Sequence, residues 1–178
     1  YNNLSIHLEK RSQQNIPKID NVVKRIILNV IKSGDKSLFK YAKKFDNSFI
    51  NESNILIPHD TRSMYKDKID PKVLNAFKTS IRNITHFHKK QFPKGFKISR
   101  NGAKINSVWK PINSVGLYIP GGNAVYPSSL IMNVIPAKVA GVKRIVLVTP
   151  SKCNKINPYI LALIDELKIE ETYQIGGA

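Results

Sequence analysis

The sequence contains a single cysteine, Cys153, and no long hydrophobic run. One cysteine excludes an internal disulfide and a metal cluster held by several thiolates, which suits a reducing compartment. No apolar segment approaches the roughly 20 residues that a membrane helix needs, and the opening residues, YNNLSIHLEKRSQQ, lack the apolar core of a signal peptide. We therefore expect a cytoplasmic protein with no membrane partner.

Acidic residues are also scarce. Only 12 Asp and Glu stand against 29 Lys and Arg, which gives a formal net charge of +17. Such a charge raises nucleic acid as a partner, but 23 of the cations are scattered lysines, whereas arginine is expected where phosphates and base edges are read. A genome rich in A and T would also favour Lys, Asn and Ile codons. We predict no nucleic-acid partner, with a basic nucleic-acid-binding module as the alternative.

The N-terminal part predicts two helices behind a polar arm of residues 1–19. Apolar residues recur at helical spacing between Val22 and Ile31, and Asp20 could cap this helix at its start. Gly34 breaks the pattern, and a second helix then runs to Asp46. We expect the apolar stripe of the first helix to lie in the core.

The next segment is less regular. Residues 47–68 are polar, with one possible short strand at residues 55–57. Pro71 suits the first turn of a helix whose apolar face continues to about Gln91. The dipeptide Asn101-Gly102, with strand-like flanks, predicts a tight hairpin.

From Val115 onward, strand and helix patterns alternate. Strands are expected at residues 115–119, 144–149 and 171–175, with helices at 128–140 and 157–167. The fold class is therefore α/β: a helical N-terminal segment followed by an incomplete doubly wound, Rossmann-like parallel sheet, which stops on its third strand and leaves an open edge there. With a boundary near Asn113, we expect a helix-rich segment with a hairpin over 20–112 and half of a Rossmann-like domain over 113–178.

The turn Pro120-Gly121-Gly122 lies between a predicted strand and helix, where phosphate-binding glycines often occur. However, the dinucleotide pattern G-x-G-x-x-G needs a third glycine that is missing here. The alternative is a turn that only ends the strand, with Ser128 or Ser129 capping the helix.

The long run VGLYIPGGNAVYPSSLIMNVIPAKVAGVKRIVLVTP, residues 115–150, closely resembles histidinol dehydrogenases. The stretches SGDKSLFKYAKKFD (33–46), IRNITHFHKKQ (81–91) and the final IGGA are similar to the same family. The resemblance implies an NAD-dependent, zinc-requiring homodimer with one zinc ion per subunit. Its expected reaction oxidises L-histidinol to L-histidine, the last step of histidine biosynthesis, in two hydride transfers.

Within this chain, the resemblance implies one NAD contact, Tyr118, with Pro120, Gly121 and Gly122 shaping the floor beneath the cofactor. Without the family, a lone strand tyrosine would be interpreted as core or rim packing. No catalytic residue and no zinc ligand can be assigned between Tyr1 and Ala178. The four histidines form no ligand pair: His7 lies in the polar arm, His59 in a polar loop, and His86 and His88 diverge on one helix.

The family's zinc ligands and its glutamate–histidine pair are expected beyond residue 178, because family chains are much longer. The chain begins with Tyr1 rather than Met. We therefore expect an N-terminal fragment that is inactive alone. A non-catalytic remnant of the enzyme is the alternative.

Overall fold

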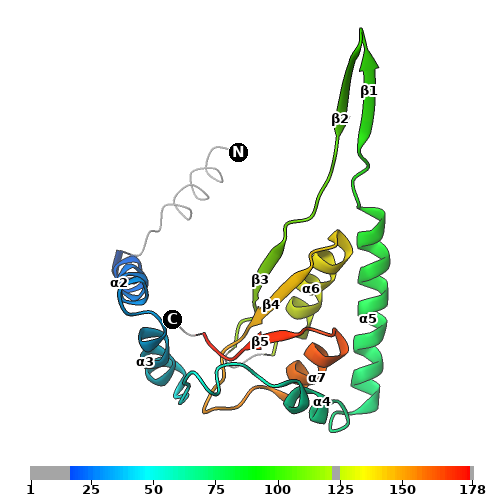
Figure 1. Ribbon diagram of the computed structural model, residues 1–178. Coiled ribbons are helices and arrows are strands. Elements are labelled where there is room, and N and C mark those ends of the chain that lie inside the picture. Colours follow the sequence, from blue (N-terminus) through cyan, green and yellow to red (C-terminus); the bar gives the residue numbers. More distant parts are fainter. Residues whose placement is uncertain (1–16, 122–124, 177–178) are drawn as a thin grey trace, which may run out of the picture.

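The computed structural model describes residues 17–121 and 125–176 and has an α/β fold (Figure 1). The elements follow in the order α2 (Pro17–Ser33), α3 (Asp35–Asp46), α4 (His59–Lys66), α5 (Pro71–Lys90), β1 (Phe96–Arg100), β2 (Ala103–Ser107), β3 (Ser114–Tyr118), α6 (Pro127–Ala140), β4 (Arg144–Val148), α7 (Pro158–Glu166) and β5 (Glu171–Tyr173). The predicted fold class is confirmed: helices come first, and a βαβαβ unit follows. None of the helices in the described residues is long and apolar enough to cross a membrane.

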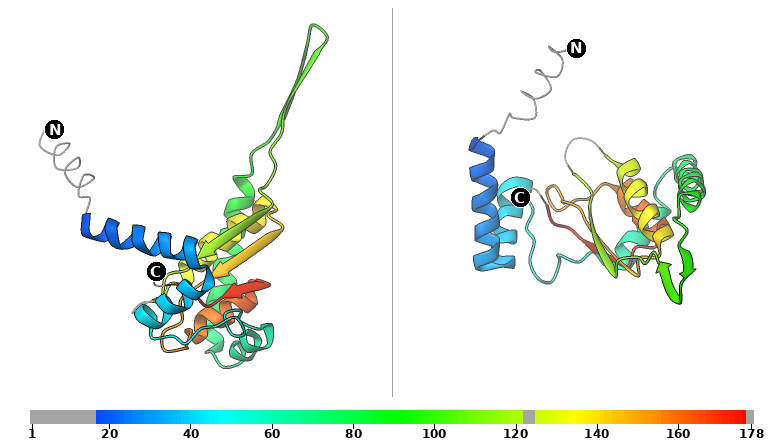
Figure 2. Two further views of the ribbon diagram at one scale, coloured as in Figure 1. Left: turned by 60° about the vertical axis from the view of Figure 1, so that its left-hand side comes forward. Right: turned by 90° about the horizontal axis from the view of Figure 1, so that it is seen from above.

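The parallel sheet has the strand order β3-β4-β5, with Val115 opposite Ile145 and Leu147 opposite Thr172. Helices α6 and α7 cover the same face of this sheet, as the view from above in Figure 2 shows. On the other face, Gly116 and Tyr118 of β3 are exposed. A complete doubly wound sheet carries helices on both faces. The described residues therefore correspond to one half of such a fold, with helices on one face of the sheet.

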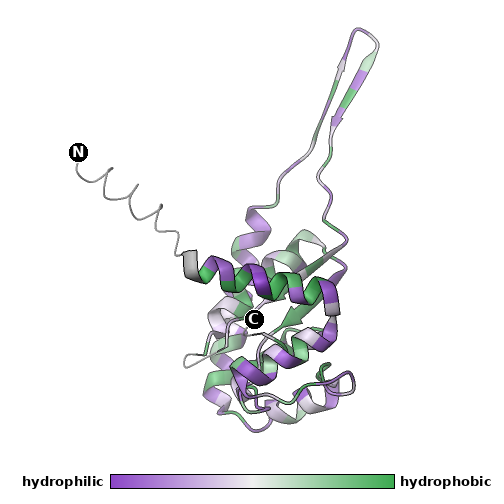
Figure 3. Cartoon of the chain, turned by 90° about the vertical axis from the view of Figure 1, so that its left-hand side faces the viewer, coloured by the Kyte–Doolittle hydropathy of each residue, from purple (hydrophilic) through white to green (hydrophobic). Residues whose placement is uncertain are grey.

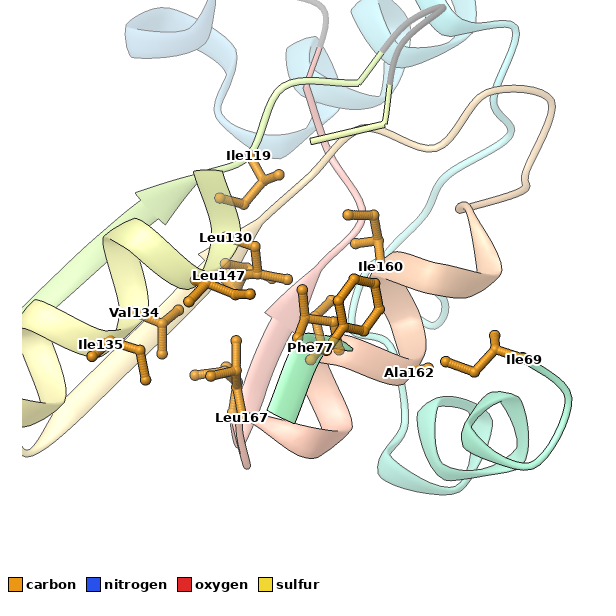
Figure 4. Packing of buried hydrophobic residues seen from close by; sticks show 14 residues of the cluster. Ile69, Phe77, Ile119, Leu130, Val134, Ile135, Leu147, Ile160, Ala162 and Leu167 are labelled. Atoms are coloured by element: carbon orange, nitrogen blue, oxygen red, sulfur yellow. The ribbon is translucent and has the colours of Figure 1, made fainter. Parts of the chain in front are cut away.

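The hydrophobic core lies between this covered face and helices α5, α6 and α7 (Figure 4). Leu130 and Val134 of α6 and Leu147 of β4 are fully buried there, and Phe77 reaches the same cluster from α5. Helix α7 supplies an apolar run, residues 160–164, which is buried on every side. Helix α5 precedes the domain boundary predicted near Asn113, yet it packs in the same core as the sheet that follows that boundary. That domain boundary stays a prediction.

The open edge of the sheet is at β3, not at the third strand. The outer side of β5 is occupied by residues 55–57, because the Ile57 amide donates to the Thr172 carbonyl and the Gln174 amide to the Ile55 carbonyl. The short strand expected at 55–57 is therefore only an isolated antiparallel bridge between Leu56 and Tyr173. No strand pairs with the outer side of β3 in the part of the chain that the structure describes.

The prediction that the apolar stripe of α2 lies in the core is wrong. Ile27, Leu28 and Ile31 are 51%, 64% and 76% exposed, and Figure 3 shows this apolar surface along α2. The helix packs on α3, where the Asn29 side-chain amide donates to the Tyr41 hydroxyl at 2.6 Å. Helical periodicity shows that one face is apolar, but it does not show what covers that face.

The starts of two predicted helices also differ from the structure. Helix α2 begins at Pro17, so Asp20 lies in its first turn and is not the cap. Helix α6 begins at Pro127 after Tyr126, so Ser128 and Ser129 lie inside the first turn and neither caps it. A proline at the first helical position needs no hydrogen-bond partner for its nitrogen, which explains the earlier starts.

Sequence patterns missed α4 entirely, and His59 is its first residue rather than part of a loop. The side chain that α4 buries is Arg62, only 2% exposed. Its guanidinium donates to the carbonyls of Ile169 and Glu170, just before β5. A charged residue at the core-facing position hides the apolar periodicity that would otherwise reveal this helix.

The hairpin prediction is confirmed. Strands β1 and β2 are antiparallel, with Arg100 opposite Ala103, and the turn residues Asn101 and Gly102 have φ angles of 50° and 78°. Two positive φ angles match the twist of a two-residue hairpin. The hairpin projects away from the rest of the chain (Figure 2).

Two leucine substitutions test the assignment of the core. Leu130→Ala should lower the free energy of unfolding by about 2–5 kcal/mol, because it leaves a cavity in a packed interior. Leu28→Ala, on the exposed face of α2, should change it by less than about 0.5 kcal/mol. Urea unfolding followed by circular dichroism measures both. Equal losses would contradict the exposure of α2.

Candidate functional site

Tyr118 is the last residue of β3 and lies where the parallel strands end. The backbone continues the ladder for one more residue, because the Ile119 amide donates to the Val148 carbonyl at 2.9 Å. Ile119 is fully buried, whereas Tyr118 is 51% exposed. Core packing is therefore excluded for Tyr118, and its ring lies at the carboxyl edge, where open α/β sheets bind ligands.

The turn after β3 packs tightly against the loop after β4. A Cβ atom added to Gly121 would overlap Cγ of Pro150, and one added to Gly176 would lie 2.8 Å from Pro150 Cβ. Gly121 therefore has a packing role, because its lack of a side chain lets the turn after β3 approach Pro150. Pro120 is exposed beside it. Gly122, the other glycine predicted at this site, lies outside the described residues.

A cavity of about 220 Å³ opens beside this turn. It is lined by Tyr118 and Gly121 from the end of β3, by Pro150, Ser151 and Lys152 from the loop after β4, and by Phe45 and Asp46 from the end of α3. The end of β3 was expected here. The contribution of α3 was not.

The end of α3 is fixed to the loop after β4 by hydrogen bonds. The Cys153 amide donates to the Asp46 carbonyl at 3.0 Å, and the Phe49 amide donates to Asn154 Oδ1 at 2.6 Å. A third hydrogen bond joins the same two segments, because the Ser151 hydroxyl donates to the hydroxyl of the fully buried Ser48 at 3.0 Å. These contacts link residues more than 100 positions apart in the sequence, so no local pattern could have revealed them.

Burial raises the pKa of the Asp46 carboxyl. No lysine or arginine forms an ion pair with it within residues 17–121 and 125–176. An acidic residue, Asp46, a tyrosine, Tyr118, and a lysine, Lys152, therefore line the same cavity. This combination can bind a ligand that carries both hydroxyl and phosphate groups.

A larger cavity, of about 930 Å³, lies between α4, α7 and the loop that follows β4. Its titratable neighbours include Cys153, Lys152 and Lys155. It shares Lys152 with the smaller cavity, but neither Tyr118 nor Gly121 lines it. We therefore place the candidate site at the smaller cavity, where the strand ends meet.

Metal ligands do not converge in the described residues, where no group of three His, Cys, Asp or Glu side chains could hold a metal ion. On α5, His86 is exposed, whereas His88 is half-buried with its ring edge-on to Phe87 at 5.4 Å. The described part of the chain offers no zinc site of its own.

The family model described as histidinol dehydrogenase matches residues 9–178. The chain belongs to the histidinol dehydrogenase family. The histidinol dehydrogenase of Listeria innocua is 44% identical over 95% of this chain, and that of Caldanaerobacter subterraneus is 40% identical over 96%. This chain spans only 39% and 40% of the lengths of these two relatives.

A solved structure gives the same assignment. The crystal structure of histidinol dehydrogenase from Elizabethkingia anophelis superposes with a TM-score of 0.82 at 31% identity. The match covers 89% of this chain and 36% of the solved chain. The arrangement of helices, hairpin and parallel sheet is therefore that of a histidinol dehydrogenase over a part of its length.

The packing role of Gly121 can be tested by adding one methyl group. Gly121→Ala should lower the free energy of unfolding by about 1–3 kcal/mol, because the new Cβ strikes Pro150. Gly116→Ala in β3 is the control, since its Cβ would meet no atom within 4 Å. It should be neutral or stabilising by up to about 1 kcal/mol. Chemical denaturation of both variants measures the difference, and a harmless Gly121→Ala would contradict the close contact.

Proposed function

We propose that the full-length protein is a cytoplasmic histidinol dehydrogenase that oxidises L-histidinol to L-histidine with NAD and zinc, as a homodimer. The observation that carries this proposal is the match to the family over residues 9–178 at about two fifths of the relatives' length. The candidate site supports it, because an aromatic residue and a tight glycine turn lie together at the carboxyl ends of parallel strands.

The residues at this site fit part of a dinucleotide. The 220 Å³ cavity is smaller than the roughly 300–1,000 Å³ of sites that enclose a drug-sized molecule, so it suits one portion of NAD. When bound, NAD supplies the acceptor for hydride. Tyr118 would offer a flat ring and a hydroxyl to the cofactor, and Pro120 with Gly121 would form the floor beneath it. Gly122 remains a proposed contact from the sequence alone.

Zinc does not fit the residues that the structure describes, as no ligand group is present there. We propose that the zinc ligands and the groups that move protons belong to parts of the full-length protein other than the described residues. In the division of roles that we propose, this chain contributes cofactor binding and L-histidinol meets its catalytic groups elsewhere.

The activity is tested by comparing two proteins in one assay. The full-length protein should form NADH from L-histidinol in the presence of zinc, whereas residues 1–178 alone should not, because catalytic zinc needs several converging ligands. NADH absorbance measures both. Turnover by residues 1–178 would show that the site is misplaced. An inactive full-length protein would favour a non-catalytic remnant.

The role of Tyr118 is tested by cofactor affinity. An aromatic contact contributes about 0.5–1.5 kcal/mol, so Tyr118→Ala in the full-length protein should weaken NAD binding about two- to tenfold. Tyr118→Phe keeps the ring and should retain most of the affinity. Calorimetric titration measures both variants. Unchanged affinity in Tyr118→Ala would remove Tyr118 from the site.

A further inference from the structure

Among the described residues that line the cavity at the strand ends, the one acidic residue comes from helix α3. Asp46, the last residue of α3, and Tyr118, the last residue of β3, both line this cavity. Asp46 is half-buried. A carboxylate in this position accepts hydrogen bonds from whatever ligand enters the cavity.

The second strand of a doubly wound nucleotide-binding sheet ordinarily ends near an acidic residue, which accepts hydrogen bonds from the adenosine ribose. Here the second strand is β4, and the residues that follow it are Thr149, Pro150, Ser151 and Lys152. None of these residues is acidic. The place beside the end of β4 is nonetheless occupied by a carboxylate, that of Asp46, which arrives from a distant part of the sequence.

The hydrogen bonds described above keep Asp46 in this place. Its carbonyl accepts from Cys153, and the neighbouring Ser48 is bound to Ser151. The loop after β4 is thereby attached to the end of α3 on both sides of Lys152. The position of the Asp46 backbone relative to the loop after β4 is therefore set by these hydrogen bonds.

We propose that Asp46 is the specificity-determining residue that accepts hydrogen bonds from the adenosine ribose hydroxyls of NAD and disfavours the phosphorylated ribose of NADP. The inference rests on the proposed function, since it assumes that NAD occupies this cavity. A ribose hydroxyl would give the partly desolvated carboxylate the hydrogen-bond partner that the described residues do not provide. A 2′-phosphate at the same place would meet a like charge.

The test measures binding of NADH and NADPH to the full-length protein by fluorescence titration. Wild type should bind NADH more tightly. Asp46→Asn should weaken NADH binding about tenfold to a hundredfold, the effect of losing a hydrogen bond to a charged group. The same variant should leave NADPH binding unchanged or improve it, so the preference for NADH falls. Asp46→Glu should retain part of that preference.

Two further variants serve as controls. Asp35→Asn removes a carboxylate at the opposite end of α3 and should change neither affinity. Lys152→Gln removes the cavity's cation and should weaken NADH and NADPH alike, because both carry the diphosphate. Thermal melting of each variant shows whether α3 stays in place. An Asp46→Asn protein that loses both affinities equally and melts at lower temperature would show a structural role and overturn the proposal.

The outcome separates this inference from the proposed function. If wild type oxidises L-histidinol with NAD while Asp46→Asn keeps the original ratio of NADH to NADPH affinity, the ribose assignment alone is wrong. If wild type binds neither dinucleotide, both the assignment and the proposed function fall.

Discussion

The hydrogen bonds between residues 46–49 and the loop after β4 determine where the N-terminal helices meet the parallel sheet. Ser48 is fully buried at this junction and bonds to Ser151, while Asn154 accepts from Phe49. Helix α2 packs on α3, so it reaches the sheet through the same connection. Buried polar groups that are paired in this way cost little, but each would cost about 1–3 kcal/mol if its partner were removed. The shape of the candidate cofactor site therefore depends on a contact that lies outside the βαβ unit.

Apolar spacing alone did not distinguish a helix face that lies in the core from one that is exposed. Leu130 and Leu28 are both leucines on helices with helical apolar spacing, yet one is fully buried and the other 64% exposed. The difference is the neighbour: α6 lies between the sheet and α5, whereas the main packing partner of α2 among the described elements is α3. The uncovered face of the sheet and the outer edge of β3 are likewise exposed because no described element packs against them. Burial is a property of pairs of elements, and a single element's pattern cannot report it.

The sequence allowed the order of elements, the parallel sheet and the hairpin to be predicted, because each depends on local signals. Asn157 caps α7 through the Tyr159 amide, and Asn101-Gly102 forms the turn that its two positive φ angles require. Helix α4 was missed because Arg62 replaces an apolar residue at the buried position. At the candidate site, Tyr118 and the glycine turn were predicted from the resemblance to the family, and their role stays a prediction. Asp46 could not be predicted, since only the tertiary fold brings it to the end of β4.

The packing of Gly121 against Pro150 distinguishes the turn after β3 from a standard phosphate-binding turn. A standard phosphate-binding turn uses glycines so that backbone can approach a pyrophosphate and the following helix can pack closely. Here Gly121 uses its lack of a side chain to admit Pro150, and Gly176 meets the same proline from the end of β5. The turn is therefore built for contact with its neighbouring loops. In the binding mode that we propose, recognition of the cofactor depends on the residues around the turn, which include Tyr118, Lys152 and Asp46.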